Sequence, residues 1–356
     1  MLRCGLVGSL NIATTCLESA LRVIAMLDQI FSGVMEGGMT QQKTALVYGG
    51  SGFIGTPIVG ALARQGWRVR VASRNVTAAR GARVFGEVGQ VATFRAPLQD
   101  EARVRAVLQG VDLVVNCVGT FTESGPQGFD AVQRDGAIRL ARLASDAGVS
   151  DFIHISTLAA DPHSASGYAR SKAEAEVGIL SYMPQATILR PSLVFGPDDQ
   201  FFNRFAAMAR LSPVLPIIGS GETKFQPVHV GDLVSAVMAA LGSDAAKGQI
   251  YAIGGAGVYS FKELMAFTIT AIRRRRSLIH VPETLASFMA MLTGWLPGAP
   301  LASDQLLLLK VDTIVEEGMK TLADLGIQAQ SIETIVPSYL EQYRPGGRFE
   351  IEYRQA

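Results

Sequence analysis

Short apolar runs alternate with longer amphipathic stretches from residue 44 onward. The runs are rich in Val, Ile, Leu and Phe, which is typical of strands buried on both faces of a sheet. We expect strands at residues 45–48, 68–71, 91–94, 112–116, 152–155 and 186–189. Helical stretches near 53–65, 100–109, 127–147 and 166–181 lie between them, with lengths that suit crossovers between parallel strands. The pattern predicts an α/β fold with a Rossmann-type, doubly wound parallel sheet.

This rhythm is lost after about Gly196, where prolines punctuate a mixed region. Here we expect two or three more helices that form a smaller mixed C-terminal cap. Four segments are predicted: an N-terminal extension (1–42), a Rossmann domain (43–196), a cap or docking region interleaved with the sheet (197–345) and a C-terminal tail (346–356).

The role of the N-terminal extension stays open. Charged residues interrupt its apolar stretch, which is therefore shorter than the run of about twenty residues that spans a bilayer. These charges are Glu18, Arg22, Asp28 and Glu36. Acidic residues are scarce in transit peptides, and no signal-peptide pattern stands out. The alternatives are a targeting segment and a translation start at Met39.

The composition of the 356-residue chain, 48% hydrophobic and 18% charged, is that of a soluble globular protein. A net charge of +1 supplies no long-range field that attracts nucleic acid, so no such partner is expected. Cys4, Cys16 and Cys117 fit neither a disulfide framework nor a zinc site. We therefore expect a reducing compartment and no metal.

A glycine-rich turn follows the first predicted strand and opens the first helix. Its sequence is Gly49-Gly50-Ser51-Gly52-Phe53-Ile54-Gly55. Gly49 permits the tight turn, Gly52 lets the backbone approach a pyrophosphate, and Gly55 lets the helix pack closely on the sheet. The helix amides then face the anion. The strand, turn, helix and second strand together predict a dinucleotide site, with candidate binding residues Gly49, Ser51, Gly52, Phe53, Ile54 and Gly55.

The residues at the end of the second strand determine which dinucleotide binds. In this chain they are Ser73, Arg74 and Asn75. An acidic residue here would hydrogen-bond the ribose 2′-hydroxyl of NAD(H), whereas a cation accepts the 2′-phosphate of NADP(H). A guanidinium matches phosphate geometry. The sequence thus favours NADP(H) over NAD(H), and a merely solvated Arg74 is the alternative.

Tyr168 and Lys172 are candidates for proton transfer. Four residues apart on a predicted helix, they share one face, and Lys172 can favour the Tyr168 phenolate. The pair follows the fifth strand, whose end carries Ser156 and Thr157 at the sheet edge where ligands bind. Thr157 is the better candidate for orienting a carbonyl.

The fourth strand ends similarly at Asn116 and Gly119, whose backbone groups we expect along the middle of the cofactor. The alternative for Ser156 and Thr157 is an ordinary strand-end hydroxyl satisfied by backbone, and the alternative for Tyr168 and Lys172 is a solvated helix face.

With these residues in hand, the chain resembles the extended and atypical short-chain dehydrogenase/reductase superfamily from about residue 43 to 345. The family's Gly-x-x-Gly-x-x-Gly turn, Tyr-x-x-x-Lys pair and upstream Ser/Thr are met by the residues named above. The segment from Arg190 through Pro191 and Ser192 to Pro197 is similar to the one that contacts the nicotinamide end in such enzymes.

Within the superfamily, the chain is similar to the NADPH-binding accessory subunit of respiratory complex I and its bacterial relatives. The stretches that carry this likeness are Arg74 and residues 197–203, 226–232, 304–310 and 324–329. The resemblance implies a tightly held, mainly structural nucleotide and docking near the quinone-reducing arm. It also connects the chain with quinone metabolism. Because Thr157, Tyr168 and Lys172 are all retained, an active NADPH-dependent reductase, epimerase or dehydratase stays open.

The tetrad Arg273 to Arg276 precedes an apolar stretch at 285–296. Basic residues beside an amphipathic helix favour anionic lipid, so we expect surface contact through the arginines, with a membrane or a partner's acidic patch. The stretch itself is more simply a core helix of the cap. The expected location is cytoplasmic, or peripheral at the inner face of the energy-coupling membrane, the matrix side in a mitochondrion.

Three hypotheses follow: an accessory or assembly subunit of NADH:quinone oxidoreductase, an active NADPH-dependent enzyme, and a redox sensor that no residue specifically favours. The sequence leaves open the substrate, the oligomeric state and whether the nucleotide exchanges.

Overall fold

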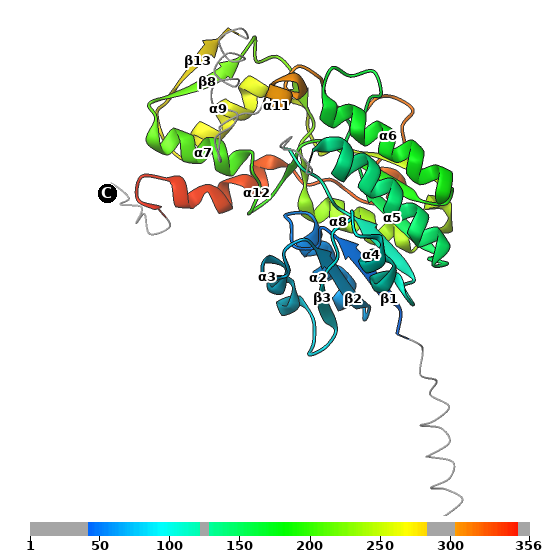
Figure 1. Ribbon diagram of the computed structural model, residues 1–356. Coiled ribbons are helices and arrows are strands. Elements are labelled where there is room, and N and C mark those ends of the chain that lie inside the picture. The colour runs from blue at the N-terminus through cyan, green and yellow to red at the C-terminus, as the bar shows by residue number, and fades with distance from the viewer. Residues whose placement is uncertain (1–41, 122–127, 283–302, 348–356) are drawn as a thin grey trace, which may run out of the picture. The chain divides into compact units, whose positions relative to one another are not determined.

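A seven-stranded parallel sheet forms the centre of the computed structural model, which describes residues 42–121, 128–282 and 303–347 (Figure 1). Residues 1–42 and 43–356 are separate units, and only the second is described below. The strand order is β11-β6-β5-β4-β1-β2-β3. Every neighbouring pair is parallel, which confirms the predicted Rossmann-type sheet.

All six predicted strands are present. They are β1 (Thr44–Tyr48), β2 (Arg68–Ser73), β3 (Val91–Arg95), β4 (Leu113–Asn116), β5 (Asp151–Ile155) and β6 (Thr187–Pro191). The sequence pattern missed the seventh, β11 (Ile250–Ile253), which pairs with β6 in the register Ile250↔Ile188. Four residues are too few to show an alternation of apolar and polar positions, so this segment is a strand because it pairs with β6.

The predicted helices are also present, with small shifts at their ends. They are α2 (Gly55–Arg64), α4 (Glu101–Leu108), α5 (Asp135–Asp146) and α6 (Gly167–Tyr182). A π-helical turn, η3 (Asp130–Arg134), leads into α5, while α3 (Val76–Ala79) and η1 (Arg80–Phe85) follow β2.

Helices cover both faces of the sheet. Ile58 and Leu62 of α2 pack with Leu233 and Val237 of α8 (Val230–Leu241) on one face. On the other face, α4, α5 and α6 contribute a second cluster that includes Leu140. Residues from the proline-rich half thus return to the sheet as α8 and β11.

Most of the remaining elements form the cap beyond the carboxyl edge of the sheet (Figure 1). They are β7 (Val194–Phe195), α7 (Phe202–Leu211), β8 (Val214–Ile218), β9 (Lys224–Phe225), β10 (Val228–His229), β12 (Tyr259–Ser260), α9 (Phe261–Ala271), β13 (Ser277–Val281), α11 (Ser303–Leu308), α12 (Ile332–Tyr339) and η6 (Leu340–Tyr343). The short turns η4 (Asp244–Ala246) and η5 (Ala323–Leu325) instead pack with α8 against the sheet, and the Ala246 carbonyl accepts the Thr187 hydroxyl at the amino edge. Helices α7 and α9 pack through phenylalanines such as Phe202 and Phe261. The expectation of two or three further helices was wrong: the described part of 197–347 contains α7, α8, α9, α11 and α12. The sequence of these helices shows no regular hydrophobic period, so the pattern did not reveal all of them.

Buried polar contacts hold the C-terminal segment in place. The Tyr339 hydroxyl of α12 donates to Asp199 Oδ2 at 2.5 Å. Asp232 of α8 accepts hydrogen bonds from the backbone and the side chain of Gln330, both at 2.8 Å. Asp199 and Asp232 belong to stretches that carried the resemblance, and their role in the structure is to anchor residues 330–339.

Within the described ranges, no helix combines the length and apolar character needed to cross a bilayer. The apolar stretch at 285–296 lies outside the described residues.

Candidate functional site

The glycine-rich turn links β1 to α2 in the conformation that the motif requires. Gly49 has φ +76°, and a Cβ there would lie 2.9 Å from the carbonyl oxygen of Cys117. The Gly52 N–H donates to the Gly49 carbonyl at 3.0 Å. A Cβ on Gly55 would lie 2.2 Å from that same carbonyl oxygen. Any side chain at Gly49 or Gly55 would therefore push the turn away from its neighbours.

A cleft of about 220 Å³ opens in front of this turn. Its lining residues are Tyr48, Gly49, Ser51, Gly52, Ala72, Ser73, Arg74, Ala96, Pro97, Leu98, Gln99, Cys117, Val118, Gly119 and Val132. Apart from Val132 of η3, they end or follow β1, β2, β3 and β4 at the carboxyl edge. The strand order reverses between β1 and β4, and ligands of open α/β sheets bind at such a reversal.

The end of β2 contributes two of its three predicted residues to the cleft. Ser73 and Arg74 line it, with the Arg74 side chain exposed. Asn75 instead directly precedes α3, where its Oδ1 accepts the Thr77 N–H at 3.0 Å and its own N–H donates to Ser73 Oγ.

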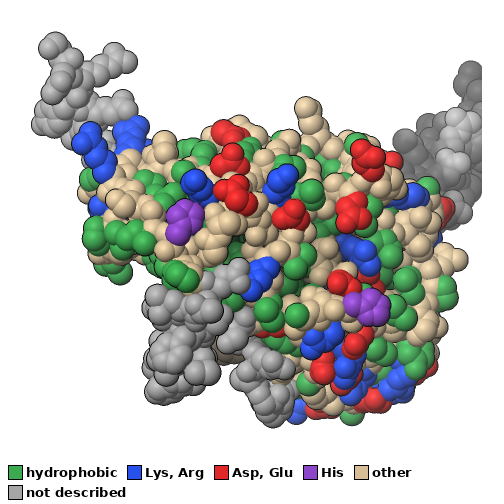
Figure 2. Space-filling view, turned by 90° about the horizontal axis from the view of Figure 1, so that it is seen from above, with side chains coloured by type: hydrophobic (Ala, Val, Ile, Leu, Met, Phe, Trp, Pro, Cys, Tyr) green, Lys and Arg blue, Asp and Glu red, His purple; other side chains and the backbone are tan. Residues whose placement is uncertain are grey.

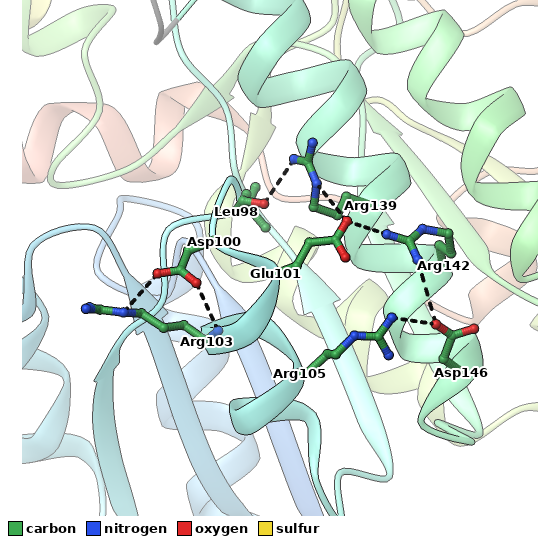
Figure 3. Close-up of polar contacts among 8 residues, drawn as sticks. All are labelled: Leu98, Asp100, Glu101, Arg103, Arg105, Arg139, Arg142 and Asp146. Carbon is green, nitrogen blue, oxygen red and sulfur yellow. Dashed lines mark hydrogen bonds and ion pairs between the residues drawn. The ribbon is translucent and has the colours of Figure 1, made fainter.

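The loop after β3 forms a wall of the cleft that sequence reasoning missed. Its residues 96–99 carry no motif, and only their position after a strand at the carboxyl edge could have revealed them. Arg139 of α5 donates to the Leu98 carbonyl at 3.1 Å, and its Nε lies 3.6 Å from Glu101 of α4 (Figure 3). Arg142 pairs with the same Glu101. Helices α4 and α5 thus fix this wall.

Other predicted cofactor residues shape the cleft from behind. Asn116 is buried, and its Oδ1 accepts the Val118 N–H at 3.1 Å, which sets the turn to Gly119 at the cleft wall. Phe53 lies against Gly196, because a Cβ built there would be 3.4 Å from the Phe53 ring. Ile54 precedes α2 in helical conformation and lies outside the cleft lining.

Tyr168 lies in a closed aromatic environment. Its side chain is only 8% exposed, its ring stacks on Phe121 with 5.1 Å between centroids, and Phe129 meets it edge-on at 6.0 Å. Burial raises the pKa of the Tyr168 phenol, and the Asp304 carboxylate raises it further. The shift is therefore opposite in direction to the lowering that we expected Lys172 to cause.

Lys172 connects the same helix to the cleft. Its Nζ donates to the Ile155 carbonyl at 2.9 Å and approaches the Val118 carbonyl at 3.4 Å. Val118 lines the cleft, so the ammonium lies directly behind that wall. Burial lowers the pKa of Lys172 to about 8, although Glu176 one turn later opposes this shift. Burial and Lys172 also lower the pKa of His154, a sheet residue that sequence reasoning missed.

The two strand-end hydroxyls differ in what they contact. Ser156 is buried and donates to Glu176, which also accepts two hydrogen bonds from Arg190 Nε at 2.9 and 3.0 Å. Thr157 is half-buried, and its Oγ1 accepts the Ala159 N–H at 3.2 Å. Thr157 is therefore the more accessible of the two.

The residues expected near the nicotinamide end lie outside the cleft lining. Pro191 ends β6, and its carbonyl accepts the Leu158 N–H at 3.0 Å. Ser192 Oγ donates to the Thr313 carbonyl at 2.6 Å and accepts the Gln226 N–H at 3.1 Å. Ser192 thus braces the C-terminal segment. Within the described residues, no cluster of three or more potential metal ligands occurs.

Comparison with known proteins places these features in context. Residues 45–254 match the NAD dependent epimerase/dehydratase family. The chain is 32% identical over 315 residues to NADH dehydrogenase (ubiquinone) 1 alpha subcomplex subunit 9, mitochondrial, of Arabidopsis thaliana, covering 85% of this chain and 78% of the relative.

Two further similarities concern enzymes. Ceramide reductase of Caulobacter vibrioides is 33% identical over 196 residues, which are 54% of this chain and 59% of the relative. The fold is similar to that of DesIV, a dTDP-glucose 4,6-dehydratase from Streptomyces venezuelae solved with NAD, with a TM-score of 0.65 and 21% identity over 84% of this chain and 96% of DesIV.

Proposed function

Because the chain belongs to the NAD dependent epimerase/dehydratase family, and within it to the family of the mitochondrial subunit 9 proteins, we propose that it is an NADP(H)-binding accessory or assembly subunit of NADH:quinone oxidoreductase. The observation that carries this proposal is a contrast within one site. The bare backbone of the glycine-rich turn leaves room for a pyrophosphate at the cleft, whereas burial raises the pKa of the neighbouring Tyr168 phenol, which stacks on Phe121.

The described residues fit a dinucleotide. Gly49 and Gly52 leave the backbone bare where a pyrophosphate approaches, and the amino end of α2 supplies N–H groups. Val118 and Gly119 form the facing wall, with Lys172 behind it. A nicotinamide supplies hydride chemistry when bound. In the proposed role, the bound nucleotide stabilises the folded protein by mass action.

The preference for NADP(H) over NAD(H) belongs to this proposal and rests on Arg74. Its exposed side chain lies at the cleft beside Ser73, at the end of β2. A guanidinium forms two parallel hydrogen bonds with a phosphate group.

We also propose that the surface around Arg273–Arg276 contacts anionic lipids at the inner face of the energy-coupling membrane. Arg274 and Arg276 donate to backbone carbonyls of Tyr343 and Ala209 at 2.9 and 2.6 Å, while Arg273 and Arg275 are exposed. Exposed apolar side chains lie nearby on α7, β8 and β13, namely Leu211, Val214 and Ile279. Hydrophobic and basic side chains gather at this end of the molecule (Figure 2).

An active reductase is the second candidate, favoured by the ceramide reductase relative and by the retained Tyr168, Lys172 and Thr157. In that function Tyr168 would move the proton, Lys172 would tune it and Thr157 would orient a carbonyl.

Native purification separates the two functions. The accessory subunit co-purifies with the membrane complex, carries stoichiometric NADP(H) that survives purification unoxidised, and leaves the membrane when high salt screens its charges. A protein in the soluble fraction with empty or freely exchanging sites would contradict this assignment. Carbonyl-dependent NADPH oxidation that is lost in Tyr168→Phe would establish the reductase instead.

A further inference from the structure

Within the described residues, the buried side-chain polar atoms that lack a hydrogen-bond partner come from four residues. These atoms are Tyr48 Oη, Asn116 Nδ2, Gln133 Oε1 and both ring nitrogens of His154. A buried polar atom without a partner costs free energy, so native proteins pair such atoms with protein, water or a ligand. An orphaned polar atom beside a ligand cleft is therefore a candidate binding group.

Three of the four residues form one row across the sheet. Tyr48 is paired with Asn116, and Asn116 with His154, in the registers of neighbouring parallel strands. Such paired residues direct their side chains to the same face of a sheet. Of the four residues, only Tyr48 belongs to the lining of the cleft. Its hydroxyl is thus the one whose partner can be a molecule bound in that cleft.

The cleft reaches the face of the sheet on which the Tyr48 ring packs. Tyr48, Ala72, Ala96 and Leu98 belong to one cluster of buried side chains, and all four also line the cleft. Ala72 is the partner of Tyr48 in the register of β1 and β2. Because Ala72 and Ala96 are small, they leave room in the cleft beside the ring.

This end of the cleft is the one that suits the adenosine half of a dinucleotide. Ser73 and Arg74 directly follow Ala72 and also line the cleft. In Rossmann sheets the end of the second strand meets the adenosine ribose. Adenine offers ring nitrogens that accept and an amino group that donates. A phenol hydroxyl both donates and accepts, so it can pair with either.

Building on the proposed function, we propose that the Tyr48 hydroxyl hydrogen-bonds the adenosine half of the bound dinucleotide. A phenylalanine would fill the same volume without burying a hydroxyl. The hydroxyl of Tyr48 therefore lowers stability in the nucleotide-free protein and contributes affinity in the bound one. A hydroxyl that pairs within the protein has the opposite effect on stability and none on affinity.

The test is Tyr48→Phe, which removes the hydroxyl and keeps the ring. In nucleotide-free protein its urea midpoint should equal or exceed that of the wild type, because an unpaired buried hydroxyl is lost. In calorimetric titrations NADPH, NADH and ADP should each bind about tenfold more weakly, the effect of one hydrogen bond. ADP is the probe for the adenosine half, since it lacks both the nicotinamide and the 2′-phosphate.

The matched control is Tyr339→Phe, the same change at a hydroxyl that has a partner. Tyr339 donates to Asp199 Oδ2 at 2.5 Å and lies outside the cleft lining. This variant should show the reverse pattern, with a lower urea midpoint in the nucleotide-free protein and wild-type affinity for all three ligands.

Wild-type affinity for NADPH and ADP in Tyr48→Phe would overturn the proposal. So would a loss for NADPH that ADP does not share, because the hydroxyl would then meet another part of the dinucleotide. A structure of the wild-type protein with ADP needs no variant, and a Tyr48 Oη beyond hydrogen-bond distance of every polar atom of ADP would also refute the contact. Wild-type protein that binds none of the three ligands would refute the dinucleotide site itself, whereas membership of the membrane complex is judged by co-purification.

Discussion

Three glycines on the β1–α2 unit allow the turn geometry to be tested by alanine substitution. A Cβ at Gly55 would lie 2.2 Å from the Gly49 carbonyl oxygen, and one at Gly52 would lie 3.3 Å from the same atom. At Gly60, on the same helix, a Cβ would lie 3.3 Å from the Phe85 side chain, which is 43% exposed. A methyl group at Gly55 would therefore clash with rigid backbone, and one at Gly52 would make a tight contact with the same backbone. A methyl group at Gly60 would meet only a side chain, which can move.

The magnitudes follow from these contacts. Alanine gains about 1 kcal/mol over glycine inside a helix, but overpacking against backbone costs about 3 kcal/mol, so Gly55→Ala should be destabilised by about 2 kcal/mol. Gly60→Ala should be stabilised by about 0.5 to 1 kcal/mol, since Phe85 yields. Gly52→Ala should lose less than about 1 kcal/mol of stability, yet its methyl group would occupy the pyrophosphate approach and weaken NADPH binding about 100-fold.

Urea unfolding of nucleotide-free protein and calorimetric titration with NADPH measure the two effects separately. Gly60→Ala, on the same helix, is the control for a general effect of the substitution. Wild-type stability in Gly55→Ala would refute the turn geometry. Normal NADPH affinity in Gly52→Ala, with the fold intact, would show that the pyrophosphate lies elsewhere.

Three further predictions concern single side chains. Because burial lowers the pKa of Lys172 to about 8 from an unfolded value of 10.5, its contribution to stability should rise with pH between those values, by up to about 3 kcal/mol. Lys172→Met should lack this rise in urea unfolding at pH 7 and 10, and parallel profiles would contradict the assignment. Tyr339→Phe removes the hydrogen bond to buried Asp199 and should cost about 2 kcal/mol of unfolding free energy, whereas an unchanged urea midpoint would show that the contact contributes nothing. Arg74→Ala should weaken NADPH binding at least about tenfold and leave NADH binding unchanged, and equal losses for both would rule out a 2′-phosphate contact.

Much of the sheet and the turn was predictable because their signals are local. The six strands from Thr44–Tyr48 to Thr187–Pro191 and the positive φ of Gly49 follow from apolar runs and from backbone sterics that neighbouring residues impose. Arg74 reaches the cleft for the same reason, since the residue after a parallel strand always lies at that edge.

The cap and the cleft wall at residues 96–99 were harder to predict from the sequence, because they contain no motif and no regular hydrophobic period. β11 is a strand only because β6 offers it an edge, and residues 96–99 matter only because Arg139 holds Leu98 over the cleft.

The sequence alone placed a tyrosine and a lysine on one helix face after the fifth strand, and it could do so because helical spacing is local. What that tyrosine can do was decided by residues far from it: Phe121 against its ring and Asp304 at the amino end of its helix. Proton affinity depends on the surrounding charges and on the exclusion of water, and only the tertiary structure brings those together.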